Sequence, residues 1–369
     1  MDLMKGKKVV SILLISLLLL SGCSGSSSMN QGSKIQEKVQ ETKVTVVEEE
    51  ETDIKKQPVK ECPEGERPVF QEVSVHDPSI IKVDDTYYIY GSHLASAKSQ
   101  DLIQWTQISA GPQKGNKLIP EPQIEMKEAL AWAETDTFWA PDVVQLEDGR
   151  FYLYYCTCRG DSPLSALGIA VSNDPEGPYE DLGIILKSGM WGQPSEDGKV
   201  YDANHHPNVV DPHTFFDQEG RLWMVYGSYS GGIFIMEMDT VTGFPLPDQG
   251  YGKKLLGAYH PRIEGPYILY SPETDYYYLF LSFGGLGTDG GYNIRVARSK
   301  NPDGPYCDSM GQDMILAKGK PGEIFYDPNI EPYGTKLMGS YQFKKEESEP
   351  AVMTEGYRSP GHNSAYYDE

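Results

Sequence analysis

One short sequence pattern recurs along this chain, and the repetition limits the possible fold more than any other feature. Each copy places two β-branched or aromatic residues after an anchor, then a turn with Asp or Gly, then an aromatic run. Four copies begin at His76, Trp139, Val209 and Glu264, and a fifth begins at Ser359. Short strands separated by turn residues at this spacing are typical of propeller blades. The sequence therefore predicts an all-β propeller domain.

Four acidic residues occupy matching places in these repeats. Asp77, Asp142, Asp211 and Glu264 each lie at or just before the first strand of a copy. The innermost strands of a propeller line a central channel, and their ends converge at one face. We therefore expect these carboxylates to meet in space. An isolated Asp-Pro pair is ordinarily a turn, so the repeat position is what favours a functional interpretation for Asp77 and Asp211.

The first 66 residues differ in composition from the rest. Residues 1–22 contain three lysines and then an apolar run that is too short to span a membrane, as in a secretory signal. Cys23 follows small residues, which resembles the lipobox of bacterial lipoproteins, so we expect its lipidation. An ordinary signal containing a cysteine is the alternative. Residues 23–66 predict a lipid anchor followed by a flexible linker, and residues 67–369 the propeller domain.

Charge narrows the choice of partners. The formal net charge is −22, which disfavours nucleic acid and anionic lipid surfaces because both are negatively charged. A neutral sugar is compatible with this charge. Membrane contact is expected through the N-terminal lipid, which would hold the protein at the extracellular face.

Seven motifs from about Val69 to Glu369 resemble, in their order, glycoside hydrolase family 43 and its endo-arabinanase branch. The resemblance implies a five-bladed propeller and inverting endo-hydrolysis of α-1,5-linked L-arabinan. An exo-acting arabinofuranosidase or β-xylosidase, and a non-catalytic glycan-binding lipoprotein, are the alternatives. The motifs are HDPSI at 76–80, FWAPDV at 138–143, HPNVVDPHTFFD at 206–217, YGSYSGG at 226–232, EGPYILY at 264–270, GGLGTDGGYNIRVARS at 284–299 and SPGHNSAYYDE at 359–369.

The resemblance assigns roles to three carboxylates. Asp77 corresponds to the general base that activates water, and Glu264 to the general acid that protonates the leaving oxygen. Asp211 corresponds to a third carboxylate that orients the acid and raises its pKa. Inversion needs an acid and a base on opposite sides of the sugar. The acid must also stay protonated near neutral pH, which a nearby negative charge favours.

The same resemblance implies a calcium ion, held largely through water, near His362; a hydrogen-bonded core histidine is the alternative. Trp139, with Phe138, is expected either to stack on a furanose ring or to pack in a blade core. Asp142 is expected either to contact substrate or to support a blade turn. Further substrate contacts are expected at Asn208, Gly168, Ser228, Tyr229 and Ser230.

Three further sequence features complete the expectations. His205, His206 and His213 match no zinc spacing and are interpreted as substrate contacts or supports of the site. The G-x-G-x-x-G string at 285–290 precedes a strand-like segment, so we expect a loop and no dinucleotide site. The fifth repeat ends after its first strand, so four complete blades and an unfinished fifth are expected.

Overall fold

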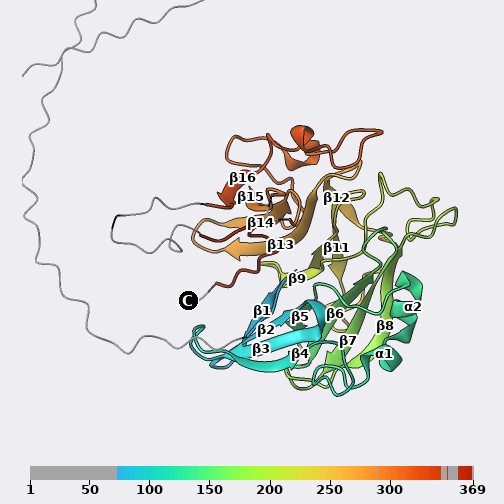
Figure 1. Cartoon of the computed structure of the whole chain (residues 1–369), viewed down its shortest axis with the longest axis vertical. Coiled ribbons are helices and arrows are strands. Elements are labelled where there is room, and N and C mark those ends of the chain that lie inside the picture. Colours follow the sequence, from blue (N-terminus) through green and yellow to red (C-terminus); the bar gives the residue numbers. More distant parts are fainter. Residues whose placement is uncertain (1–72, 288, 342–346, 348–355, 368–369) are drawn as a thin grey trace, which may run out of the picture. The chain divides into compact units, whose positions relative to one another are not determined.

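The computed structural model (Figure 1) describes residues 73–287, 289–341, 347 and 356–367. The predicted signal, Cys23 and the predicted linker lie outside the described residues. Within the part of the chain that the structure describes, no helix combines the length and the apolar character needed to cross a membrane.

The described residues form four antiparallel sheets, each of four strands that are consecutive in the chain. The first sheet contains β1 (Ser79–Val83), β2 (Thr86–Gly91), β3 (Ala95–Ser99) and β4 (Thr106–Ala110). The second contains β5 (Asp142–Gln145), β6 (Phe151–Cys158), β7 (Ser165–Ser172) and β8 (Glu180–Ser188).

The third and fourth sheets repeat the same strand order. The third contains β9 (His213–Phe216), β10 (Leu222–Tyr226), β11 (Ile233–Met238) and β12 (Lys253–Leu256). The fourth contains β13 (Ile263–Ser271), β14 (Tyr276–Phe283), β15 (Asn293–Ser299) and β16 (Thr335–Met338).

The sheets are arranged as propeller blades, with their first strands on the inside (Figure 1). Strand β1 contacts β5, β5 contacts β9, and β9 contacts β13. Three apolar cores fill the spaces between successive sheets, for example around Tyr90 and Leu153, around Tyr154 and Met224, and around Val225. The all-β propeller predicted from the repeats is confirmed, with four blades in the described residues.

How deeply a strand is buried depends on whether its sheet has neighbouring sheets on both faces. Every residue of β6 and β7 is buried, because the first and third sheets cover both faces of the second. Strand β14 instead alternates between buried and half-buried residues along most of its length. Tyr277 and Leu279 of β14 pack into the core shared with the third sheet, so the less buried residues lie on the opposite face of the strand.

Short helices occupy connections between strands. Helices α1 (Pro122–Glu125) and α2 (Lys127–Ala133) precede β5, and α2 packs on β6, β7 and β8. The hydroxyl of Thr157 donates a hydrogen bond of 3.0 Å to the carbonyl of Ala129, which ties α2 to β6. The remaining helices are single 3₁₀ turns: η1 (Ser92–Leu94), η2 (Met314–Leu316) and η3 (Asp327–Asn329).

Residues 356–367 lie between the fourth and first sheets, as the dark red segment of Figure 1 shows. The hydroxyl of Tyr267 on β13 donates to the carbonyl of Ala365 at 2.8 Å. The ring of Tyr366 meets Tyr87 on β2 edge-on, with centroids 5.8 Å apart. This segment therefore takes the place of the fifth repeat, although its described residues form no strand.

Asp142, the first residue of β5, ties three blades together. Its side chain accepts hydrogen bonds from Ser79 Oγ at 2.6 Å, from the backbone N–H of Thr214 at 2.7 Å and from Thr214 Oγ1 at 2.5 Å. The residue is 2% exposed. Of the two roles that the sequence left open for Asp142, substrate contact and structural support, the structure favours support.

Replacing Asp142 by alanine is expected to destabilise the propeller by about 2–4 kcal/mol, because it leaves buried donors of Ser79 and Thr214 without an acceptor. The free energy of unfolding in urea measures this loss. The exposed Asp136 supplies a matched control, since Asp136→Ala removes a carboxylate that supports no blade contact. Equal stability of the two variants would contradict this role for Asp142.

Candidate active site

The inner strands bring three of the predicted carboxylates together. Asp77 lies two residues before β1, Asp211 two residues before β9, and Glu264 is the second residue of β13. The backbone N–H of Gly265 donates to Asp211 Oδ2 at 3.2 Å, which joins the Glu264 segment to Asp211. His362 Nδ1 lies 3.6 Å from Asp77 Oδ1, while the His362 ring lies beside Gly265. The convergence expected from the repeat positions is therefore present for three carboxylates, whereas the fourth, Asp142, bonds to Ser79 and Thr214 instead.

Asp77 is held in its ionised form. Ser92 Oγ donates to Asp77 Oδ2 at 2.6 Å, and His76 Nδ1 lies 2.7 Å from the same oxygen. Burial alone would raise the pKa of this carboxyl group. The interactions with His362, Ser92 and His76 together outweigh burial and hold the pKa of Asp77 below its usual value.

Asp211 has the opposite environment. It is 4% exposed, and burial, followed by the nearby charge of Asp77, raises its pKa to about 7. The hydrogen bond from the Gly265 backbone opposes this rise without cancelling it. A buried carboxylate without a cationic partner avoids the cost of desolvation by keeping its proton.

Glu264 is also buried, at 8% exposure. Its Oε2 accepts from Ser228 Oγ at 2.8 Å, and its Oε1 accepts from the Tyr292 hydroxyl at 2.9 Å. Burial, followed by the charge of Asp211, raises the pKa of Glu264 to about 7, although both donors act in the opposite direction. The Glu264–Asp211 pair therefore keeps a proton near neutral pH, while Asp77 stays ionised.

Backbone strain marks the same place. Asp77, Asp211 and His362 have φ values of 52°, 57° and 46°, in the left-handed region that non-glycine residues seldom adopt. All three lie where an inner segment begins, so the backbone turns sharply at each of these positions as it enters the central channel. Strain of this kind concentrates at functional sites, where the surrounding structure holds it in place.

Two of the predicted substrate-contact residues lie beside Glu264, and two others are buried. Ser228 contacts Glu264 directly, and Tyr229 is half-buried beside it. Burial, followed by the charge of Glu264, raises the pKa of Tyr229. Ser230 is 3% exposed. Asn208 is buried, and its Oδ1 accepts from Ser165 Oγ at 2.5 Å.

Two of the other predicted contacts have packing roles. Gly168 lies inside β7, and a Cβ atom there would come within 2.3 Å of the Tyr155 ring. This glycine therefore makes room for the tyrosine, and its predicted substrate contact finds no support. Phe138 is fully buried in the core between the first and second sheets, so it cannot stack on a sugar. Trp139 is half-buried against the next core and retains an exposed part.

The three histidines near Asp211 support the fold in different ways. His213 Nε2 lies 2.9 Å from the Ile268 carbonyl, and its ring stacks on Tyr267 with centroids 3.6 Å apart. His206 Nδ1 accepts the backbone N–H of Asp202 at 2.8 Å. His205 is exposed at the surface. That these histidines bind no zinc stays a prediction.

The residues around His362 do not fit a calcium cage built by the protein. Calcium takes six to eight oxygen ligands. In the described residues, no group of three or more His, Cys, Asp or Glu side chains could hold a metal ion. Asn363 Oδ1 is a buried oxygen without a hydrogen-bond partner, but one oxygen is far from a full set. Calcium beside His362 therefore stays a prediction from sequence.

Two contacts were missed by sequence reasoning although a repeat pointed to them. The β1–β2 and β9–β10 hairpins both end in Tyr-Gly-Ser. The first serine, Ser92, donates to Asp77, and the second, Ser228, donates to Glu264. Equivalent serines thus hold the two carboxylates. Tyr292 was also missed, because nothing in its loop sequence indicates that its hydroxyl reaches Glu264.

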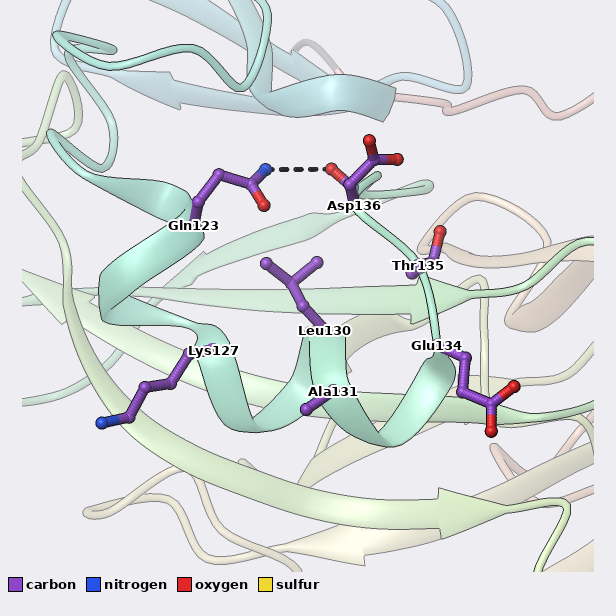
Figure 2. A pocket seen from close by; sticks show the side chains of 7 residues that line it. All are labelled: Gln123, Lys127, Leu130, Ala131, Glu134, Thr135 and Asp136. Carbon is purple, nitrogen blue, oxygen red and sulfur yellow. Dashed lines mark hydrogen bonds between the residues drawn. The ribbon is translucent and has the colours of Figure 1, made fainter.

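A separate hollow of about 570 Å³ opens beside α1 and α2. Figure 2 shows its lining side chains, with Gln123 Nε2 donating to the Asp136 carbonyl at 2.9 Å. The hollow shares no residue with the carboxylate cluster, and the side chains of Lys127 and Glu134 point outward at its opposite ends (Figure 2). The carboxylate cluster is therefore the candidate active site.

The raised pKa of Glu264 predicts a pH-dependent cost in stability. Between about pH 4.5 and pH 7 the unfolded chain ionises at this position while the folded protein keeps the proton, so stability falls as pH rises. Glutamine does not titrate. Glu264→Gln is therefore expected to gain roughly 1–3 kcal/mol over the wild type between pH 4 and pH 8.

Chemical denaturation of both proteins at pH 4 and pH 8 measures this gain. Glu273→Gln, at an exposed turn, is the matched control and should show no such difference. A gain at Glu264 no larger than at Glu273 would show that the site does not raise the pKa of this group.

Comparison with known proteins places this chain in a family. Residues 66–329 match the model for glycosyl hydrolases family 43. The chain is 64% identical over 305 residues to extracellular endo-alpha-(1->5)-L-arabinanase 2 of Bacillus subtilis (strain 168), covering 83% of this chain and 64% of that protein. It is 55% identical over 307 residues to an extracellular endo-alpha-(1->5)-L-arabinanase of Thermotoga petrophila, covering 82% and 64%. The chain thus spans less than two thirds of the length of these relatives.

Solved structures of related proteins also superpose on this chain. A family 43 glycoside hydrolase from Bacillus licheniformis superposes with a TM-score of 0.78 at 67% identity, over 82% of this chain and 67% of the other. The Thermotoga petrophila endo-1,5-alpha-L-arabinanase gives a TM-score of 0.77 at 55% identity, over 82% and 67%. The resemblance read from the seven motifs is confirmed: the chain belongs to glycosyl hydrolases family 43.

Proposed function

We propose that this protein is an inverting, endo-acting hydrolase of α-1,5-linked L-arabinan. The observation that carries the proposal is the opposite displacement of two pKa values, with Asp77 held low and Glu264 raised to about 7. Carboxyl groups whose pKa values are pushed apart in one site are the pattern of an acid and a base. The endo-arabinanase relatives supply the substrate and the bond position.

Asp77 acts as the general base. Its lowered pKa keeps it ionised, so one oxygen can accept a proton from a water molecule that attacks the anomeric carbon. Ser92 and His76 both approach Oδ2. They hold the carboxylate in one orientation and leave Oδ1 for the water, beside His362.

Glu264 acts as the general acid on the other side of the bond. As the bond between the anomeric carbon and the glycosidic oxygen breaks, the proton of Glu264 passes to that oxygen and the remaining chain departs as an alcohol. The attacking water forms the new bond from the opposite side, which inverts the anomeric centre. Ser228 and Tyr292 keep the glutamate in place after it ionises, because both donate to its oxygens.

Asp211 orients and tunes this acid. It accepts from the backbone of Gly265, so it holds the segment that carries Glu264. Its negative charge, when present, raises the pKa of the acid. The pair then retains the proton that the reaction needs at neutral pH.

The sugar chain would be held by side chains around these carboxylates. Asn208, Tyr229 and Ser230 come from loops that border Asp211 and Glu264, and Trp139 retains an exposed part for stacking. A neutral arabinan also suits a chain with a net charge of −22.

The proposal extends to the domain plan and the location, which the sequence and the relatives support. Residues 1–22 would be a lipoprotein signal, Cys23 the lipidated residue, and residues 23–66 an anchor and linker that place the catalytic domain outside the membrane. Both arabinanase relatives are described as extracellular. Residues 67–369 would form a five-bladed propeller in which the segment 356–367 begins the fifth blade.

The first test is product sizing on debranched arabinan. We expect a ladder of short arabino-oligosaccharides whose new reducing ends have the inverted configuration by NMR. Asp77→Asn and Glu264→Gln should each lower kcat by about 10²- to 10⁴-fold, since each removes one proton transfer. Asp84→Asn, an exposed aspartate with a similar φ of 51° on the same sheet, should retain full activity.

Other outcomes would reject parts of this proposal. Arabinose as the single product would indicate an exo-acting enzyme. Arabinan binding without hydrolysis, unaffected by Asp77→Asn, would indicate a glycan-binding protein. Retained configuration at the new reducing end would exclude the base role of Asp77.

Asp211→Asn tests the tuning of the acid. Removing its negative charge lowers the pKa of Glu264, so the acid ionises earlier as pH rises. The alkaline limb of the kcat profile should therefore move to lower pH, while the acid limb, set by Asp77, stays close to its place. An unchanged alkaline limb would show that Asp211 does not control the proton on Glu264.

A further inference from the structure

A long loop at residues 317–327 is hydrogen-bonded to the loop that precedes β13. The backbone N–H of Gly319 donates to the carbonyl of Ala258 at 2.9 Å, and that of Phe325 donates to the carbonyl of His260 at 3.1 Å. These bonds fix both ends of the loop against the segment leading to Glu264. The position of Phe325 is therefore built into the fold.

The ring of Phe325 packs against the residue beside the proposed acid. Phe325 and Tyr229 meet edge-on, with centroids 5.4 Å apart and an interplanar angle of 77°. Tyr229 itself is close enough to Glu264 for that charge to raise its pKa. The backbone N–H of His260 also donates to the carbonyl of Ser230 at 2.9 Å. This bond ties the loop that precedes β13 to the loop that carries Tyr229. The order outward from the acid is therefore Glu264, Tyr229, Phe325.

An arginine holds the same ring from another direction. The guanidinium of Arg262 lies 5.2 Å from the centroid of Phe325, and its Nη1 donates to Asp327 Oδ2 at 3.0 Å. Arg262 is two residues before Glu264 and Asp327 is two residues after Phe325. One side chain thus links the acid-bearing strand to the loop.

Packing alone does not explain Phe325. Its φ of 58° is unusual for a bulky residue, and the residue remains 40% exposed although two side chains hold it. A strained backbone that keeps an aromatic ring in solvent gains little for folding. Both features are typical of a ring held ready for a ligand.

The proposed chemistry indicates which part of the substrate the ring of Phe325 would contact. In an inverting displacement the base lies by the attacking water and the acid lies by the leaving oxygen. The departing sugar chain must therefore extend from Glu264 away from Asp77. Tyr229 borders the first sugar of that chain, and Phe325, one ring further out, would border the second.

We infer that Phe325, held by Arg262 and Tyr229, is a specificity-determining platform for the second sugar of the leaving chain. The inference rests on the proposed function. Binding of this remote sugar holds long chains more tightly, so it raises kcat/KM on long chains and not on chains without a second leaving sugar. Phe325 thereby favours internal bonds over the last bond of the chain, where the leaving group is a single sugar.

The test compares Phe325→Ala with Ile324→Ala on α-1,5-arabinobiose, which has no second sugar on its leaving side, and on α-1,5-arabinohexaose. Ile324 is the matched control because it is the neighbouring apolar residue, 66% exposed. Phe325→Ala should lower kcat/KM on the hexaose about tenfold, equivalent to about 1.4 kcal/mol, chiefly through KM. The biose rate should change less than about twofold and the pH profile should not move. Phe325→Tyr, which keeps a stacking ring, should restore the hexaose rate.

Three results would overturn the platform. Equal losses on both substrates, with a shifted alkaline limb, would mean that Phe325 merely supports Tyr229 and Glu264. A hexaose rate in Phe325→Ala equal to that in Ile324→Ala would mean that the ring contacts no sugar. A Phe325→Tyr variant that folds but does not restore the hexaose rate would exclude stacking.

A binding measurement separates this inference from the proposed function. Calorimetric titration of arabinohexaose into Glu264→Gln, with and without Phe325→Ala, needs no turnover. A tenfold weaker Kd with Phe325→Ala supports the platform even if the wild type hydrolyses nothing. Absence of hexaose binding by Glu264→Gln would overturn the platform. If the wild type hydrolyses arabinan but Phe325→Ala leaves the Kd of Glu264→Gln unchanged, the platform alone is rejected.

Discussion

The burial of Glu264 beside Asp211 is the interaction on which the rest of the site depends. Two adjacent buried carboxyl groups cannot both ionise cheaply, so the pair keeps a proton near neutral pH. Asp77 escapes this constraint because His362, Ser92 and His76 stabilise its charge. One small region therefore holds a proton donor and a proton acceptor, which is what the proposed hydrolysis requires.

The propeller creates this region through repetition. Each blade delivers the start of its inner strand to the same face, and the chain enters with a sharp left-handed turn at Asp77 and at Asp211. The hairpin ends of the first and third blades each add a serine, at Ser92 and Ser228, that fixes one carboxylate. Asp142 lies two positions further along in the second blade, as the first residue of β5, and it accepts hydrogen bonds from Ser79 and Thr214. Acidic residues at the starts of the inner strands thus include both catalytic candidates and a structural tie.

The repeat register was enough to predict the propeller and the meeting of Asp77, Asp211 and Glu264, because blade geometry converts sequence position into place. It was not enough for Gly168, whose contact with Tyr155 depends on which way a neighbouring ring crosses the sheet. Phe138 was equally ambiguous, since its full burial follows from packing between two sheets. Phe325 carries no motif, and its position comes from backbone bonds between loops. Periodicity locates strands, whereas side-chain direction and loop contacts arise from the assembled fold.

The most direct measurement of the account is a carbon-13 NMR titration of the side-chain carboxyl groups in the wild-type protein, assigned with single Asp and Glu variants. The account predicts that Glu264 titrates near pH 7 and Asp77 below its usual pKa of 3.8. A site with this separation holds its acid and its base ready before substrate arrives. Titration of Glu264 near its ordinary value of 4.5, with Asp77 at the same or a higher pH, would contradict the account.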